Sequence, residues 1–139
     1  MKSNIKLKPW GREIWWADTP KYAGKILEVK KGERLSLQFH HQKEETQFLF
    51  AGEIRITFGM HISKLRNKIL KPGEVFHIPP KLIHRVEGIA SLSIIFEVST
   101  PHLTDVVKLA DDYGRSGSGN DEETDCKLAQ KKITRTGSR

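Results

Sequence analysis

The sequence predicts an all-β domain, built as a sandwich or a barrel. Seven short runs rich in β-branched and aromatic residues recur at roughly ten-residue spacing, and Gly or Pro pairs lie between them. Helical periodicity is weak along the chain. The runs are GKILEVKKG, RLSLQFH, TQFLFAG, IRITFG, EVFHIPP, HRVEG and SLSIIFEVSTP. We therefore expect short antiparallel strands joined by tight turns.

The N-terminal segment, which precedes these runs, is rich in tryptophan. Trp10, Trp15 and Trp16 are expected to form a strand or a lid that packs over the barrel. Together with the predicted strands, this segment gives one expected domain over residues 1–113. A domain of this size can bury a continuous apolar core.

The C-terminal end is expected to be less regular. Around 101–113, Thr104 or Asp105 is a possible N-cap, which predicts a short closing helix or turn. Residues 114–139 contain few aliphatic side chains and no aromatic one, too few to offset the entropy of ordering. We expect a flexible polar tail there, with a weakly amphipathic helix near 122–133 as the alternative.

Composition narrows the class of protein. The hydrophobic share of 37% and charged share of 29% are typical of a soluble globular chain. No apolar run approaches the roughly 20 residues of a membrane-spanning helix and no signal-peptide pattern is present, so no membrane partner and a cytoplasmic location are expected. Cys126 is the single cysteine, which excludes an internal disulfide. The net charge of +7 is spread without a Lys/Arg block, which argues against nucleic acid and suits a phosphorylated small molecule.

Four side chains in two segments are candidate metal ligands. In RLSLQFHHQKEETQFLF, side chains two apart share one face of a strand, so Gln38 and His40 point to one place. After a turn over 41–44, Glu45 opens the next strand, and a hairpin would bring it opposite this face. His84, after the Pro-Pro turn of GEVFHIPPKLIHRV, is the candidate fourth ligand. Such nitrogen and oxygen donors suit one divalent ion per subunit: Zn, Mn, Fe, Ni or Co.

The spacing of these residues resembles the two motifs of the cupin family. The first motif is G, five residues, H, one residue, H, three or four residues, E, six residues, G. It matches 32–52, with Gln38 in place of the first histidine. The second motif is G, five residues, P, one residue, G, two residues, H, and it matches 73–84 with Lys81 in place of the second glycine. The resemblance implies a single-domain cupin, that is, a double-stranded β-helix or jelly-roll barrel.

Within the cupins, SLQFHHQKEE resembles the Gln-x-His-His segment of type II mannose-6-phosphate isomerases. The stretches KPWG, IPPKLIHRVE and EVSTPHLTDVVKLADDYGR agree with the same family, so the resemblance covers about residues 8–115. The family's His-Arg-x-Glu-x-Trp pattern reads QKEETQ over 42–47, which puts Lys43 at the arginine and Gln47 at the tryptophan. This departure bears on the substrate, because an ammonium and a guanidinium bind phosphate differently.

The resemblance implies a metal-dependent enzyme that interconverts an aldose and a ketose, with a sugar or sugar phosphate as its partner. Glu45 and Glu97 are the candidate catalytic groups, and Gln47 and Lys43 are the candidate substrate-binding residues. On its strand Glu97 is either an exterior charge or a pocket acid/base with a perturbed pKa, and the exterior position is favoured. Two other functions remain open: a module that binds a sugar or nucleotide-sugar without turnover, and a mononuclear iron oxygenase.

One of the predicted strands also indicates a protein partner. Its inward face is taken by Gln38 and His40. Leu35, Leu37 and Phe39 are then expected outside, as an apolar patch that another surface must cover. A second subunit or the tryptophan-rich segment would cover it, and a twofold homodimer is the expected arrangement.

Overall fold

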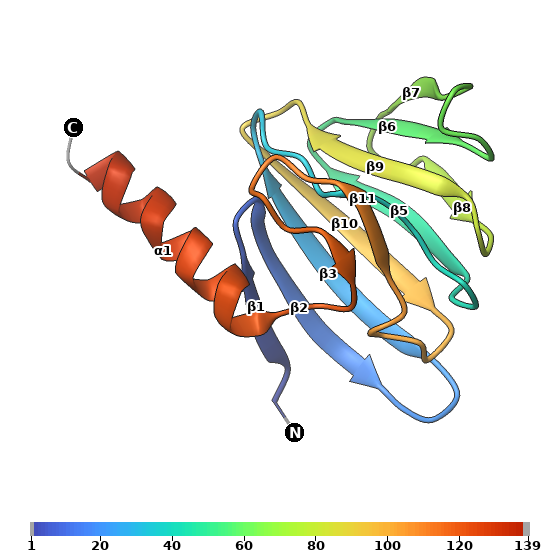
Figure 1. Ribbon diagram of the computed structural model, residues 1–139, viewed down its shortest axis with the longest axis horizontal. Coiled ribbons are helices and arrows are strands. Elements are labelled where there is room, and N and C mark those ends of the chain that lie inside the picture. The colour runs from blue at the N-terminus through green and yellow to red at the C-terminus, as the bar shows by residue number, and fades with distance from the viewer. Residues whose placement is uncertain (1, 138–139) are drawn as a thin grey trace.

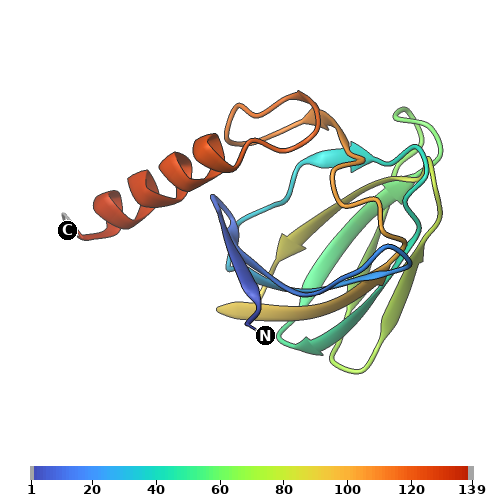
Figure 2. The ribbon, with the colours of Figure 1, turned by 90° about the horizontal axis from the view of Figure 1, so that it is seen from below.

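The structure is a computed structural model that describes residues 2–137, with side chains described for residues 2–131. Two six-stranded antiparallel sheets face each other, and a helix follows them in the chain (Figure 1). Figure 2 shows the sheets curving around a common interior, with the helix extending away from them. The predicted all-β barrel is therefore confirmed. Within residues 2–137, no helix has both the length and the apolar character needed to cross a membrane.

The two sheets are each assembled from distant parts of the chain. The first has the order β1-β2-β3-β10-β5-β8 and the second β12-β11-β4-β9-β6-β7. The strands of the first sheet are β1 (Asn4–Lys8), β2 (Gly11–Asp18), β3 (Ala23–Lys30), β10 (Leu92–Ser99), β5 (Glu45–Ala51) and β8 (Val75–Ile78). Those of the second are β12 (Gly117–Ser118), β11 (Val107–Ala110), β4 (Leu37–Phe39), β9 (Ile83–Gly88), β6 (Ile54–Gly59) and β7 (Arg66–Leu70). The helix, α1, spans Glu122–Gly137.

The apolar core lies between the sheets. Ile95 of β10 is directly opposite Leu27 of β3 and Leu49 of β5, and all three are buried. Trp10, from the turn between β1 and β2, packs into the same cluster, as expected for the N-terminal segment. Trp16 instead points outward and is 53% exposed. The buried cluster is formed by Trp10, Leu27, Val29, Leu49, Ile54, Ile56, Leu70, Val86 and Ile95.

The predicted hairpin between the two ligand-bearing strands is wrong. β4 pairs with β9 and β11 in the second sheet, whereas β5 pairs with β10 and β8 in the first. The turn over 41–44 therefore crosses from one sheet to the other. As a result, Glu45 approaches Gln38 and His40 across the interior of the barrel rather than along a shared ladder.

The predicted apolar patch at 35–39 is also wrong. Leu35 packs against the core and Leu37 is buried, because the chain before Leu37 is not a regular strand and the two-residue alternation fails there. Exposed apolar side chains lie instead on the outer face of the first sheet. There Phe96 of β10 stacks on Phe50 of β5, with 4.9 Å between the ring centroids.

The C-terminal segment carries more secondary structure than the sequence favoured. A turn at 103–104 matches the expected closing turn, and β11 then pairs with β4. Where a flexible tail is the favoured prediction, the structure has β12 and α1, which agrees with the alternative helix near 122–133 and extends it. The most buried of the described side chains of α1 is charged: Asp125 is buried and pairs with Lys8 of β1 at 2.7 Å, and Ala129 is buried one turn further along.

Candidate metal centre

Two rows of inward-facing side chains, one on each sheet, form the walls of a polar pocket. In the second sheet, Gln38 of β4 is directly opposite His84 of β9. In the first sheet, Glu97 of β10 is directly opposite Gln47 of β5. Directly opposite residues share one face of a sheet, and all four side chains line the pocket. The barrel therefore brings together residues that are up to 59 positions apart in the sequence, from Gln38 to Glu97.

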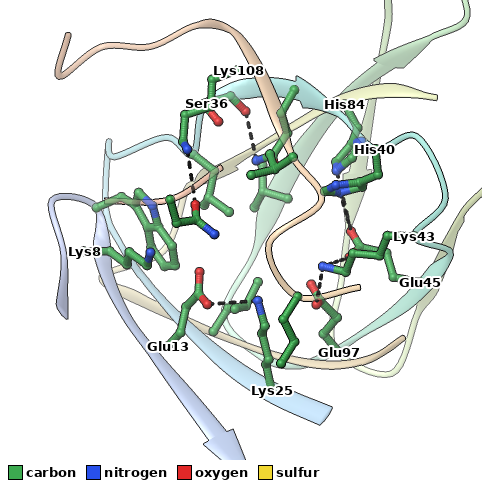
Figure 3. A pocket seen from close by; sticks show the side chains of 18 of the residues that line it. Lys8, Glu13, Lys25, Ser36, His40, Lys43, Glu45, His84, Glu97 and Lys108 are labelled. Carbon is green, nitrogen blue, oxygen red and sulfur yellow. Dashed lines mark hydrogen bonds and ion pairs between the residues drawn. The ribbon is translucent and has the colours of Figure 1, made fainter. Parts of the chain in front are cut away.

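His40, Glu45 and His84 converge in this pocket. One ligand atom from each residue lies within 4.8 Å of the other two. Glu45 Oε1 is 3.5 Å from His84 Nε2 and 4.0 Å from His40 Nε2, and all three side chains are buried. In Figure 3 the two imidazoles and the carboxylate point toward one another. Two imidazole nitrogens and a carboxylate oxygen form a set that could hold a divalent transition-metal ion.

Backbone carbonyls fix the orientation of both imidazoles. His40 Nδ1 donates to the carbonyl oxygen of Asp105, and His84 Nδ1 donates to that of Leu82 at 2.9 Å. Each ring therefore keeps its proton on Nδ1 and turns the Nε2 lone pair toward Glu45, as metal-binding histidines do. Burial lowers the pKa of His40 to about 3, and the positive charge of Lys43 acts in the same direction. His40 is thus neutral, the state that binds metal.

Gln38 lies beside this cluster. Its amide nitrogen donates to the backbone oxygen of Ser36 at 3.3 Å, which leaves Oε1 as the atom that could reach an ion. Across the ladder Gln38 faces His84, so its side chain enters the pocket from the same wall. The fourth predicted ligand is therefore in the pocket, next to the three that converge.

Lys43 joins two buried carboxylates at the edge of the cluster. Its Nζ is 2.7 Å from Glu45 Oε2 and 3.1 Å from Glu97 Oε2. The amide of Gln47 donates to the same two carboxylates at 3.5 and 3.4 Å. Glu97 is thus inside the pocket, and the exterior position favoured from the sequence is wrong, because Phe96 takes the outward face of β10.

Burial and ion pairing act differently on the two carboxyl groups. Burial raises the pKa of Glu97, and the neighbouring charge of Glu45 raises it further. Burial also opposes ionisation of Glu45, but the charge of Lys43 outweighs it and holds the pKa of Glu45 below its usual range. Burial disfavours the charged form of Lys43, yet the two carboxylates keep its pKa above the usual range. Glu45 is therefore suited to bind a cation and Glu97 to carry a proton.

Lys81 occupies the position of the second motif's missing glycine. Its φ of 70° lies in the left-handed region that glycine adopts most easily. The backbone N–H of Lys81 donates to the carbonyl oxygen of His40 at 2.7 Å. The left-handed turn thus ties the loop before β9 to the residue that carries one of the two imidazoles.

Further charged side chains, which the sequence did not single out, also line the pocket. The sequence held part of the signal for these residues. Lys25 is two residues before the buried Leu27 and four before Val29 on β3, so all three share the inner face of the strand. The space open to water at the centre of the pocket has a volume of about 60 Å³, and the pocket is partly open to solvent. The additional residues are Lys8, Glu13, Lys25 and Lys108.

Two facing antiparallel sheets around a His–Glu–His cluster define a cupin. The capsular polysaccharide assembling protein CapF from Staphylococcus aureus is similar, with a TM-score of 0.67 and 19% identity over 78% of this chain and 34% of that chain. Oxalate decarboxylase from Bacillus subtilis has a TM-score of 0.67 and 21% identity over 76% of this chain and 29% of that chain. At these identities the likeness concerns the fold alone.

The sequence comparison gives the family. The family described as Mannose-6-phosphate isomerase C-terminal matches residues 2–111, and the chain belongs to this family. Mannose-1-phosphate guanylyltransferase of Escherichia coli K12 is 35% identical over 112 residues, which are 78% of this chain and 22% of that protein. Xanthan biosynthesis protein XanB of Xanthomonas campestris is 29% identical over 113 residues, 78% of this chain and 23% of that protein. The chain thus spans less than a quarter of the length of these relatives, and α1 lies beyond the family match.

Proposed function

We propose that this domain binds one divalent metal ion and isomerises a phosphorylated sugar between its aldose and ketose forms. The observation that carries the proposal is the convergence of His40, Glu45 and His84 in a pocket that also holds a second carboxylate, Glu97. Gln38 completes the proposed ligand set. Membership of the family, and relatives named for mannose 1-phosphate, support a sugar phosphate as the ligand class.

The chain's own residues account for the proton transfer in this proposal. An ion held by the cluster would polarise a carbonyl or hydroxyl oxygen of the sugar. Glu97 takes the proton from the carbon next to the carbonyl and delivers it to the former carbonyl carbon, while the proton of the adjacent hydroxyl passes to the former carbonyl oxygen. The raised pKa of Glu97 makes it a stronger base than an exposed carboxylate. Lys43 orients Glu97 through their ion pair at 3.1 Å. Gln47 Oε1 is buried without a hydrogen-bond partner among the described residues, so it is available to a sugar hydroxyl.

Binding without turnover is the second candidate function. One observation favours it: the ion pair with Lys43 partly offsets the rise in the pKa of Glu97 that burial causes, and so limits its strength as a base. In this alternative the pocket holds a sugar or a nucleotide-sugar, and Glu97 only orients it. The two candidates share the metal site and differ in the role of Glu97.

Metal content tests the site that both candidates share. The purified protein is expected to contain one divalent ion per chain by elemental analysis, and His40→Ala combined with His84→Ala is expected to remove it. His61→Ala is the matched control, because His61 is exposed in the turn between β6 and β7. Full metal retention in the double variant would overturn the ligand assignment.

An isomerase screen over phosphorylated and free hexoses and pentoses separates the two candidates. For the enzyme, Glu97→Gln is expected to lower kcat by about 100-fold or more while metal content stays unchanged. Substrate-dependent heat of binding without any turnover would support the binding module instead. Rapid oxygen consumption with ferrous iron and substrate would contradict both and support an oxygenase.

A further inference from the structure

The pocket continues away from the cluster of His40, Glu45 and His84 into a region lined by cations. Figure 3 shows Lys8 and Glu13 on the side opposite Lys43 and Glu45. Four of the five lining cations form ion pairs with carboxylates, among them Lys8 with Asp125 at 2.7 Å. The four are Lys8, Lys25, Lys43 and Arg115.

Lys108 is the exception. Its Nζ donates to the backbone oxygen of Gly119 and to Asn120 Oδ1, at 3.2 Å for the latter. Both acceptors are neutral, and within residues 2–131 no carboxylate lies within ion-pair distance of this ammonium. Burial lowers the pKa of Lys108, and the charge of Arg115 lowers it further. The more distant charges of Asp125 and Asp111 act in the opposite direction. An ammonium has three N–H donors, so Lys108 is a partly buried cation with one donor that no described protein group accepts.

The register of the second sheet fixes where this cation lies. Lys108 of β11 is directly opposite Gln38 of β4, and Gln38 is directly opposite His84 of β9. Lys108 and His84 are therefore two strand spacings apart on one face, about 9–10 Å between their backbones. The extended carbon chain of a hexose together with a terminal phosphate covers a distance of this order. A ligand with its carbonyl at the metal cluster would carry its far end to Lys108.

We infer that Lys108 binds the phosphate of a sugar phosphate monoester whose carbonyl end reaches His40, Glu45 and His84. The inference rests on the proposed function and adds the position of the phosphate. Phosphate oxygens accept the remaining ammonium N–H and bring a negative charge into direct contact with Lys108. Arg115 and Lys8 lie nearby, but Asp125 and Asp111 balance their charges through ion pairs, which leaves Lys108 as the cation without a carboxylate in contact.

The position of the cation makes the predicted specificity directional. A sugar phosphorylated at the carbon farthest from its carbonyl spans the pocket, whereas one phosphorylated next to the carbonyl does not. A nucleotide-sugar presents a diphosphate next to the anomeric carbon and so fits this arrangement less well. Lys108 thus discriminates between ligands by the position of their phosphate and not by the stereochemistry of the sugar.

Calorimetric titration of the metal-loaded full chain tests the inference, with mannose 6-phosphate, mannose and GDP-mannose as probes. Lys108→Gln is expected to weaken mannose 6-phosphate binding about tenfold or more and to leave mannose binding unchanged. Lys108→Arg is expected to restore most of the affinity, because it keeps the charge. Lys68→Gln, an exposed lysine of β7, is the control and is expected to bind like the wild type.

The outcomes separate the inference from the proposed function. Equal affinity of the wild type and Lys108→Gln for mannose 6-phosphate, at unchanged metal content and melting temperature, would overturn the phosphate site. Wild-type protein that binds neither mannose 6-phosphate nor GDP-mannose would also overturn it. Tighter binding of GDP-mannose, lost in Lys108→Gln, would assign the cation to a diphosphate and overturn the monoester. Binding of mannose 6-phosphate without turnover would support the site while counting against the isomerase.

Discussion

His40 and Asp105 are connected through both the backbone and the side chain of Asp105. The Asp105 carbonyl oxygen accepts the Nδ1 proton of His40. Its carboxylate accepts the backbone N–H groups of the three residues that follow His40, at 3.1, 2.7 and 2.9 Å. Burial opposes ionisation of Asp105, but these three hydrogen bonds outweigh it and lower its pKa to about 2. One residue thus sets both the ring of His40 and the turn that carries the chain on to Glu45.

Asp105→Ala is therefore expected to weaken metal binding while leaving every proposed ligand in place. Removing a group that orients a metal ligand typically costs about 10- to 100-fold in affinity. Competition against a chromophoric chelator measures the change. Asp18→Ala, at an exposed position in β2, is the control. An unchanged metal affinity in Asp105→Ala would contradict the positioning role.

The stability of the fold is expected to fall in acid through Glu13. Burial raises the pKa of Glu13, but the charges of Lys25 and Lys8 outweigh burial and bring it to about 2. A carboxyl group with a lowered folded-state pKa stabilises the protein above its unfolded pKa of about 4.5, and this contribution disappears as the pH falls toward 2. The shift corresponds to about 3 kcal/mol in total.

Urea unfolding of the wild type and Glu13→Gln at a series of pH values measures this contribution. The wild type is expected to lose its advantage over Glu13→Gln progressively below pH 4.5. Glu123→Gln, an exposed change in the first turn of α1, controls for the loss of one acid and is expected to follow the wild type. A constant difference between wild type and Glu13→Gln from pH 6 to pH 2 would contradict the assignment.

Asp125→Ala is expected to destabilise the fold by about 3 kcal/mol, because it leaves a buried cation without its partner. Asp125 Oδ2 is 2.7 Å from Lys8 Nζ, and Oδ1 is 3.0 Å from Arg115 Nη1. Both Lys8 and Asp125 are at most 5% exposed. The free energy of unfolding in urea reports the loss. Glu123→Ala removes the exposed pair with Lys127 and is expected to cost less than about 1 kcal/mol. Equal costs for the two variants would show that α1 is held by something other than Asp125.

The convergence of His40, Glu45 and His84 could be predicted from the sequence because each of the two motifs that carry these residues is short and local. The spacing of His40, Glu45 and His84 survives as a motif even though the hairpin expected between the first two does not exist. The inward position of Glu97 was harder to predict, because both faces of β10 carry large apolar residues, with Ile95 inside and Phe96 outside. Alternation separates the faces of such a strand but does not say which one is buried.

The cation-lined end of the pocket and the docking of α1 could not be predicted for a related reason. A buried lysine can be predicted only when the acid that pairs with it is known. The partner of Lys8 is Asp125, 117 residues away in the sequence. Among the described residues of α1, Ala129 is the one buried apolar side chain beside the Asp125 ion pair, so hydrophobic periodicity gave little signal for the helix. The segment is polar, as its composition indicated, but composition does not show that Asp125 pairs with Lys8.

The expected homodimer remains a prediction, and the structure changes where its interface is expected. Across the outer face of the first sheet, Phe96 lies opposite both Ile26 and Phe48, and Phe48 lies opposite Val75. This row crosses four strands without a charged residue. Phe50, 55% exposed, stacks on Phe96. A sheet face this apolar is typical of a subunit contact, and a twofold axis would pair it with the same face of a second copy.

Phe50→Glu combined with Phe96→Glu is therefore expected to convert a dimer into a monomer. Charges facing one another across an apolar interface oppose association, whereas both positions are accessible to water in the single chain, so the monomer is expected to keep its fold. Light scattering after size-exclusion chromatography measures the mass, and the melting temperature reports folding. Ile62→Glu, 62% exposed in the turn between β6 and β7, adds a charge elsewhere and is expected to leave the dimer intact. A monomeric wild type, or a dimer that survives both glutamates, would contradict this interface.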